Sequence, residues 1–186
     1  MSLLITGLTL WVVIHLFPAL CKNTRTTIIE KIGLMPYKGL FALIILSSVV
    51  LIVFGWQSIT PEDIYTPVSW GRHITFTLVL LTFILFVAAR RKTNIKRFLR
   101  HPQLTGLVLW SIGHLFANGD NRSVILFMTL GLWAILEIIL INKREGAWQK
   151  PEAVAMTSDV ITVIGGFVLY AALMFAHPYL SGIKLM

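Results

Sequence analysis

The sequence predicts an all-α integral membrane protein, a bundle of about six transmembrane helices that forms a single domain over residues 1–186. Hydrophobic residues make up 56% of the chain and the mean hydropathy is +0.81, which is more apolar than a water-exposed surface sustains. The apolar runs are continuous rather than alternating, which favours helices over the strands of a membrane barrel. Because the connections are short, no separate soluble domain is expected.

The apolar runs set the expected helices in order. A hydrocarbon core of about 30 Å takes about 20 helical residues. The expected spans are residues 3–20, 37–56, 70–89, 102–118, 123–141 and 158–176. No charged segment precedes the first run and no small-residue cleavage pattern follows it, so we expect a retained span rather than a signal peptide.

The first two connections carry helix signals of their own. Residues 27–30, Thr-Ile-Ile-Glu, have the spacing of a capping box, and Gly33 and Pro36 act as stop signals. This pattern predicts a short interfacial helix. Residues 60–63, Thr-Pro-Glu-Asp, combine a cap residue, a proline and two acids, which predicts a second small helix on the outer surface.

The later connections show turn and boundary signals. Residues 118–121, Asn-Gly-Asp-Asn, are typical of a tight turn. Residues 157–159, Thr-Ser-Asp, offer caps for the last helix. His101 precedes Pro102 at the expected start of the fourth span, and His177-Pro178 is expected to stop the last helix.

Basic residues are distributed unequally between the two sides of the expected bundle. The odd-numbered connections hold 13 of the 16 Lys and Arg residues, namely Lys22, Arg25, Lys31, Lys38, Arg90, Arg91, Lys92, Lys96, Arg97, Arg100, Lys143, Arg144 and Lys150. By the positive-inside rule these connections are cytoplasmic and both termini lie outside, in the periplasm, which predicts a multi-pass protein of the bacterial inner membrane. Topology and attraction to anionic membrane lipid thus account for the net charge of +8, and nucleic-acid binding is not expected.

The third connection, residues 90–100, is the most basic and also carries Ile95, Phe98 and Leu99. Two interpretations stay open. The segment lies on an anionic cytoplasmic leaflet, or it is a solvated topology signal. The single cysteine, Cys21, excludes an intramolecular disulfide, a Cys-rich zinc site and the Cys-x-x-Cys-His attachment of c-type haem.

Two histidines lie inside apolar spans, where a polar side chain is costly and is therefore a candidate for a site. His15 and His114 stand in matching strings, Trp-x-x-x-His-Leu-Phe, at residues 11–17 and 110–116. The face of the second string that is expected to point into the bundle carries Trp110, Ser111, His114 and Asn118.

The chemistry of these histidines leaves three interpretations. Neutral imidazole is a common metal ligand, and two facing imidazoles without a carboxylate or thiolate suit b-type haem better than zinc or calcium. The histidines could instead relay protons or polarise a substrate, or only tie helices together by hydrogen bonds. Glu137, alone in the fifth span, is expected to pair with a buried donor.

The order of these motifs resembles the NnrU family over most of the chain. The resemblance is carried by Gly7, His15-Leu16, Arg25, Gly33, Tyr37-Lys38, Arg100-His101-Pro102, Trp110, His114-Leu115, Asn118-Gly119-Asp120 and Ser123. Members of that family are associated with denitrification as accessory proteins linked to nitrite and nitric oxide reductase activity, so components of those reductases are the implied partners. They are also similar to the plant and cyanobacterial 15-cis-zeta-carotene isomerase, an integral membrane protein with b haem.

The resemblance implies that His15 and His114 are the axial ligands of b haem. The residues expected to shape the pocket are Trp11, Trp110, Ser111 and Asn118, and those expected at the anionic propionates are Arg25, Lys38 and Arg100. Ser111 stands where the isomerase has a cysteine proposed to exchange with histidine. A hydroxyl is a poor iron ligand beside a thiolate, so this departure argues against such a ligand switch.

Three functions follow from the sequence. The first is a membrane b-haem protein with a role linked to nitrite and nitric oxide reduction. The second is a haem-dependent cis-trans isomerase of a carotenoid or another polyene lipid, which would make the chain an enzyme. The third is a haem-free assembly factor for respiratory membrane complexes. No catalytic residue is assigned.

Overall fold

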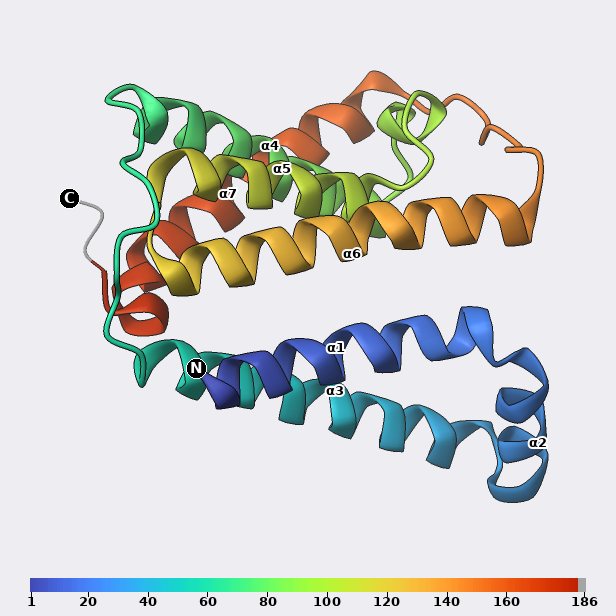
Figure 1. The fold of residues 1–186 in the computed structure, drawn as a ribbon. Helices are drawn as coiled ribbons and strands as arrows, with labels where there is room; N and C mark the ends of the chain where they lie inside the picture. The colour runs from blue at the N-terminus through green and yellow to red at the C-terminus, as the bar shows by residue number, and fades with distance from the viewer. Residues whose placement is uncertain (184–186) are drawn as a thin grey trace. The chain divides into compact units, whose positions relative to one another are not determined.

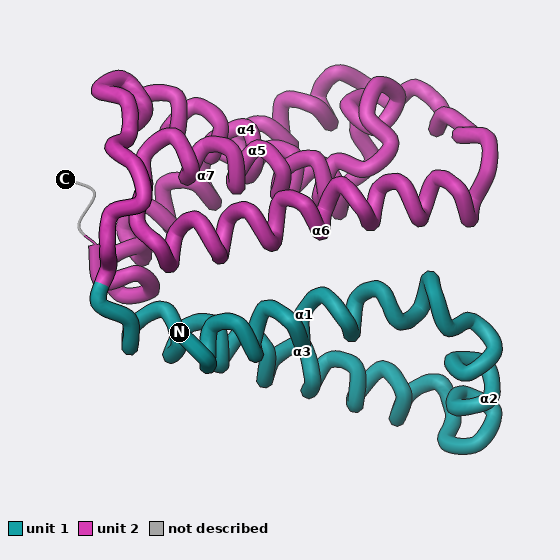
Figure 2. The backbone as a smooth tube through the Cα atoms, viewed as in Figure 1, with its two compact units in different colours: residues 1–60 teal, residues 61–186 magenta. Residues whose placement is uncertain are grey.

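The computed structural model describes residues 1–183, and that part of the chain is helical (Figure 1). The helices are α1 (Ser2–Leu20), α2 (Lys22–Ile32), α3 (Leu34–Gln57), α4 (Gly71–Arg90), the 3-10 helix η1 (Asn94–Arg97), α5 (Pro102–Ala117), α6 (Asn121–Glu145) and α7 (Met156–Ser181). The chain forms two compact units, unit 1 over residues 1–60 and unit 2 from residue 61 onward (Figure 2).

Five of these helices, α1, α3, α4, α6 and α7, combine the length and the apolar composition that crossing a membrane requires. All six predicted runs form helices, so the all-helical fold is confirmed. The fourth predicted span, which forms α5, has only 16 residues. At a rise of 1.5 Å per residue it extends about 24 Å, less than a hydrocarbon core of about 30 Å. The prediction of six full spans is therefore not confirmed.

Unit 1 is a close pair of long helices joined by α2. Gly7 on α1 faces α3 so closely that a Cβ atom there would lie 2.8 Å from the backbone nitrogen of Ile52. Gly55 on α3 faces α1 in the same way, because a Cβ atom there would overlap the backbone of Leu4. Small residues allow membrane helices to approach at backbone distance. Glycine therefore sets the packing of unit 1.

The predicted interfacial helix is present as α2, but two of its boundary signals are wrong. Thr27 lies inside the helix, and its hydroxyl donates to the carbonyl of Asn23, 3.1 Å away, rather than capping an N-terminus. Gly33 does end α2, with a φ of +88° that favours glycine. Pro36 lies in the first turn of α3, where a missing N–H costs nothing, so it opens a helix instead of stopping one.

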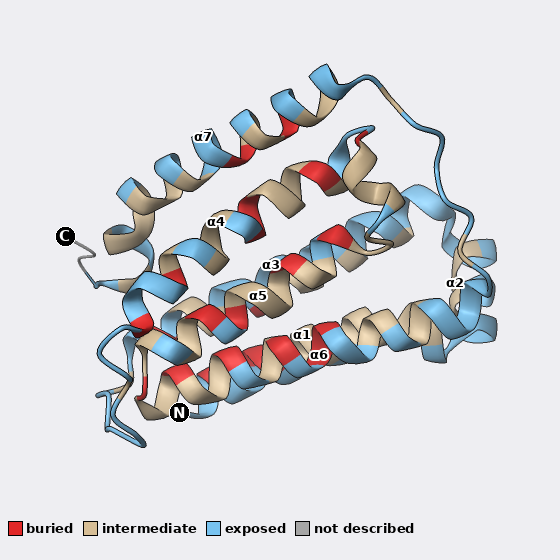
Figure 3. Cartoon of the chain, turned by 90° about the horizontal axis from the view of Figure 1, so that it is seen from above, coloured by how far each residue is buried: buried red, intermediate tan, exposed pale blue. Residues whose placement is uncertain are grey.

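In unit 2, α4 packs against α5 and α7, and α5 also packs against α6. Two threonines on α4 join it to α5. Thr75 donates to the carbonyl of Gly113 at 2.6 Å, and Thr82 donates to the carbonyl of Gly106 at 2.8 Å. The two threonines are seven residues apart on α4, and the two glycines are seven residues apart on α5. Seven residues make about two helical turns, so the two bonds lie on the same face of each helix. Figure 3 shows buried residues along the inner sides of these helices and an outer face of α7 that is largely exposed.

The predicted small helix at residues 60–63 is wrong. The backbone there bonds to the turn between α5 and α6 instead: Asn121 donates to the carbonyl of Glu62 at 2.8 Å, and Ile64 and Tyr65 donate to the carbonyl of Gly119 at 2.8 and 3.1 Å. Tertiary partners thus replace local helix bonds. The predicted turn is confirmed, because α5 ends at Ala117 and α6 begins at Asn121.

Both ends of α7 also differ from expectation. The helix begins at Met156 without a side-chain cap, and the hydroxyl of Ser158 donates to the carbonyl of Lys92 instead. At the other end Pro178 lies inside the helix, which continues to Ser181. A proline stops a helix only where its missing bond cannot be tolerated, and here it removes a single bond in the last turn.

Candidate functional site

His114 lies near the C-terminal end of α5, in a cluster with two aromatic rings that also contact each other, 4.8 Å apart. Its Nδ1 lies 2.8 Å from the carbonyl oxygen of Trp110, one turn earlier on the same helix. Its ring lies 4.7 Å from the Trp110 ring and stacks on Phe127 of α6, with centroids 4.5 Å apart and planes 26° from parallel. The imidazole is therefore held by its own helix on one edge and by α6 on one face.

His15 in unit 1 repeats this local arrangement. Its Nδ1 lies 2.8 Å from the carbonyl oxygen of Trp11, one turn earlier on α1. The two ring centroids are 4.3 Å apart, and Phe41 of α3 approaches His15 edge-on at 6.0 Å. The matching strings predicted from sequence thus produce matching geometry in two separate units.

The bonds at Nδ1 fix how each histidine is protonated. A carbonyl oxygen only accepts hydrogen bonds, so Nδ1 carries the proton in each ring. In the neutral form the lone pair then belongs to Nε2. For His114, no hydrogen bond to Nε2 occurs among the residues that the structure describes. This nitrogen is therefore available as a donor atom for a ligand.

Ser111 lies in the packing seam between α5 and α6. The side chain is fully buried, and its hydroxyl makes no hydrogen bond to any described residue. Its Cβ would lie 3.0 Å from a Cβ placed on Gly131 of α6. Ser111 and His114 thus both face α6, at Gly131 and at Phe127. At Ser111 the two helices are therefore in direct contact, with no space between Ser111 and Gly131.

Asn118 lies at the C-terminus of α5, where it caps the helix. Both its backbone nitrogen and its Nδ2 donate to the carbonyl of His114, at 2.8 and 2.9 Å. Its own carbonyl accepts from the hydroxyl of Tyr65 at 2.9 Å, and Tyr65 also donates to the carbonyl of Leu115. A loop residue therefore holds the last turn of α5, which carries His114. The lining role predicted for Asn118 stays a prediction.

The three basic residues expected at haem propionates occupy different settings. Arg25 on α2 lies over the ring of Tyr37, 5.8 Å from its centroid. Lys38 is exposed in the first turns of α3. Arg100 in unit 2 binds Glu145 at 3.3 Å and the carbonyl of Gly146 at 2.8 Å, which joins the start of α5 to the end of α6. Arg100 thus links the two helix ends.

The remaining histidines and the intramembrane acid have different surroundings. His73 is exposed on α4, and His101 shares a hydrogen bond with Asn142 at 2.9 Å. His177 on α7 is held by the carbonyl of Ile183 at 3.0 Å. Glu137 on α6 has a buried Oε2 that accepts no hydrogen bond from the described residues, so the expected pairing with a buried donor is not observed.

Sequence reasoning did not identify Phe127 and Tyr65 as parts of this site. Phe127 is one of several aromatic residues in an apolar span, and only the packing register of α6 on α5 brings it to His114. Tyr65 lies 50 residues away from Leu115 in the sequence. Neither residue stands in a motif that contains the histidine, so no local pattern could have indicated them.

The sequence of the chain matches a known protein family over almost its whole length. The family model described as NnrU protein matches residues 3–185, which is nearly the whole chain. Neither a curated protein nor a solved structure matches it. The chain therefore belongs to the NnrU family.

Proposed function

We propose that this chain is an integral membrane b-type haem protein in which His114 and His15 supply the axial ligands. The observation that carries the proposal is the bond from each Nδ1 to a tryptophan carbonyl, 2.8 Å away in both cases. Histidines that bind a metal are typically oriented by such a bond at the ring nitrogen that does not bind it. The imidazole of His114 is thus prepared to bind iron through Nε2, and the bond at His15 orients that ring in the same way.

The surroundings of the histidines fit this cofactor. His114 contacts the rings of Trp110 and Phe127, and His15 contacts those of Trp11 and Phe41, so both lie among aromatic side chains suited to an apolar macrocycle. No group of three or more His, Cys, Asp and Glu side chains comes together among the described residues. A donor set of imidazoles alone matches b-type haem rather than the carboxylate and thiolate sites of calcium or zinc.

The same bonds argue against a role that is only structural. If His114 served only to tie helices together by hydrogen bonds, one of its ring nitrogens would bond across a helix pair. Instead, Nδ1 of each ring bonds to its own helix, where it contributes nothing to packing between helices. A bond of this kind orients the ring, as is expected for a histidine whose Nε2 binds a metal.

Haem supplies a redox-active iron, which with two histidine ligands suits electron transfer or sensing. Membership of the NnrU family supports a role linked to nitrite and nitric oxide reduction, with components of those reductases as partners. The apolar helices and the basic connections support a location in the bacterial inner membrane.

The absorption spectrum of the full chain tests this proposal. Protein purified in detergent from cells with ample haem is expected to show a Soret band, with sharp α and β bands after reduction. Colourless protein under these conditions would contradict haem binding. Deletion of the gene tests the role separately, since rates of nitrite and nitric oxide reduction in membranes of the deletion strain are expected to fall, and unchanged rates would remove the denitrification link.

A further inference from the structure

We propose that the connection between α4 and α5, residues 90–100, is a binding surface for anionic phospholipid, with Phe98 inserted among the acyl chains and the exposed cations at the headgroup phosphates. This surface is independent of the proposed haem site. It rests on the charges, the exposure of Phe98 and the bonds that hold the segment in place.

The end of unit 2 that carries this segment has a surplus of positive charge. Its basic residues are Arg90, Arg91, Lys92, Lys96, Arg97, Arg100, Lys143, Arg144 and Lys150, and its acids are Glu145, Glu152 and Asp159. Two of the acids are already engaged. Glu145 pairs with Arg100 at 3.3 Å and Arg144 at 3.1 Å, and Asp159 accepts bonds from the neutral side chains of Thr93 and Asn94.

The three cations at the start of the segment are left without acidic partners. Arg90, Arg91 and Lys92 are exposed and form no ion pair with any residue in the described part of the chain. Three adjacent cations near a membrane are attracted to an anionic surface, and their contributions add. Lys96 differs from them, because its ammonium donates to the carbonyl of Ala89 at 2.8 Å and thereby caps α4.

Phe98 supplies the apolar part of the surface. It directly follows η1, and the residue is 84% exposed, far more than most aromatic residues of this chain. An aromatic ring among cations at the end of membrane helices is typical of a segment that lies in the interface. Insertion into lipid removes this ring from water, which a solvated loop would not do.

The segment is held rigidly enough to present this ring. Asp159 at the start of α7 accepts bonds from the backbone nitrogen and the Nδ2 of Asn94, at 2.8 and 2.6 Å. Asn94 also exchanges two bonds with the backbone of Val154, at 2.8 and 3.0 Å. Because these bonds order the loop in advance, lipid binding costs less conformational entropy.

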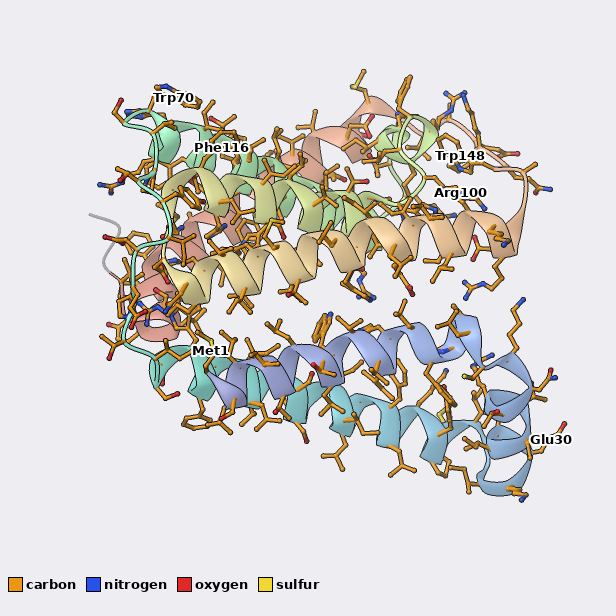
Figure 4. The ribbon with its side chains drawn as sticks, viewed as in Figure 1. Met1, Glu30, Trp70, Arg100, Phe116 and Trp148 are labelled. Carbon is orange, nitrogen blue, oxygen red and sulfur yellow. The ribbon has the colours of Figure 1, made fainter. Side chains whose placement is uncertain are left out.

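The position of the segment along the helices matches the headgroup region. Figure 4 shows Arg100 and Trp148 at one end of unit 2 and Trp70 and Phe116 at the opposite end. Aromatic residues at both ends mark the two interfaces of a membrane-spanning bundle. Residues 90–100 connect helix ends on the side of Arg100 and therefore lie at the level of the phosphates.

The test measures the thermal stability of the full chain in a neutral detergent with added lipid. Ligands that bind the folded state raise the unfolding temperature. Phosphatidylglycerol is expected to raise it, whereas phosphatidylcholine and free glycerol phosphate at the same concentration are not. The rise is expected to shrink in 0.5 M salt, a concentration chosen because it screens exposed charges.

Variants separate this surface from other cations. Replacing Arg90, Arg91 and Lys92 together by glutamine is expected to abolish most of the rise, and Phe98→Ser to reduce it. Arg72→Gln, at the opposite end of unit 2, is the control and is expected to keep it. An equal rise with phosphatidylcholine, or with phosphatidylglycerol in the triple variant, would overturn the proposal. If the triple variant fails to fold, Phe98→Ser and the salt series in the unmodified protein decide in the same way.

Discussion

His114 on α5 stacks on Phe127 of α6, with ring centroids 4.5 Å apart and planes 26° from parallel. Phe127 is buried, so this contact both packs two helices and fixes the plane of the imidazole. A stacked ring cannot rotate freely about its own bonds, and the direction of Nε2 is therefore set by α6 as well as by the bond to Trp110.

Removing this ring is expected to affect both stability and haem. Phe127→Ala opens a cavity and should destabilise unit 2 by about 3–5 kcal/mol. Phe127→Leu keeps most of the volume and should reduce the stability by less. It removes the stacking contact, however, so the imidazole ring of His114 can rotate. In haem-loaded protein we expect both variants to lose haem faster to apomyoglobin than the unmodified chain. Equal loss rates in Phe127→Leu would mean that stacking does not orient His114.

Substitution of Ser111, unlike that of Phe127, is expected to increase the stability of the protein. Its hydroxyl is buried without a partner, so Ser111→Ala removes a polar group whose desolvation is not offset. We expect stability to rise by up to about 1 kcal/mol. Gly131→Ala, across the same seam, forces a Cβ to within 3.0 Å of the Ser111 Cβ and should lower it. Unfolding in a mixed-micelle denaturant series measures both; a loss of stability in Ser111→Ala would reveal a partner for the hydroxyl.

The bonds between α4 and α5 can be tested with two threonines on one helix. Thr75 donates to the carbonyl of Gly113 on α5 at 2.6 Å, whereas Thr77 is exposed and bonds only to His73 on its own helix. Thr75→Val should destabilise by about 0.6–1.7 kcal/mol, the range for hydrogen bonds between membrane helices. Thr77→Val is the matched control and should stay within about 0.5 kcal/mol. Equal effects would show that the bond to Gly113 contributes nothing.

Tyr65 predicts a pH dependence at the loop that holds α5. Burial, and then the negative charge of Asp120, raise the pKa of the Tyr65 phenol above its usual value of 10.0. The neutral phenol donates to the carbonyls of Leu115 and Asn118, and the phenolate cannot. Because the folded-state pKa is raised, this contribution is complete below the unfolded pKa and is lost as pH rises through the folded pKa.

The measurement compares the chain with Tyr65→Phe by limited proteolysis of residues 61–70 between pH 8 and pH 11.5, a range chosen to bracket the phenol. Cleavage of the unmodified chain should accelerate at the alkaline end, whereas the variant should be cleaved faster at pH 8 and show a smaller change. Parallel profiles for the two proteins would contradict a role for the Tyr65 hydroxyl.

The sequence predicted the helices well where apolar composition decides them. All six apolar runs form helices, and the turn at residues 118–121 is present, because length and composition suffice for both. Cap and stop signals did worse. Residues 60–63 and residues 157–159 have the composition of helix starts, yet their polar groups bond to distant segments, at the turn after α5 and at residues 92–94. Local patterns do not contain these partners.

In the candidate site, too, the features set by local helical spacing could be predicted and those set by packing between elements could not. The Trp-x-x-x-His strings predicted that each histidine shares a face with a tryptophan, and helical geometry alone produces that relation. The stacking of Phe127 and the bonds of Tyr65 depend on how α6 and the 61–70 loop pack on α5, which periodicity does not give. The closed seam at Ser111 likewise depends on the absence of a side chain at Gly131.

The most direct test of haem ligation is the reduced spectrum of three glycine variants with and without added imidazole. His114→Gly and His15→Gly should lose the sharp α and β bands, and free imidazole should restore them because it fills the vacated axial position. His73→Gly, an exposed histidine of α4, should keep the bands throughout. Bands that persist unchanged in both His114→Gly and His15→Gly would contradict the central claim.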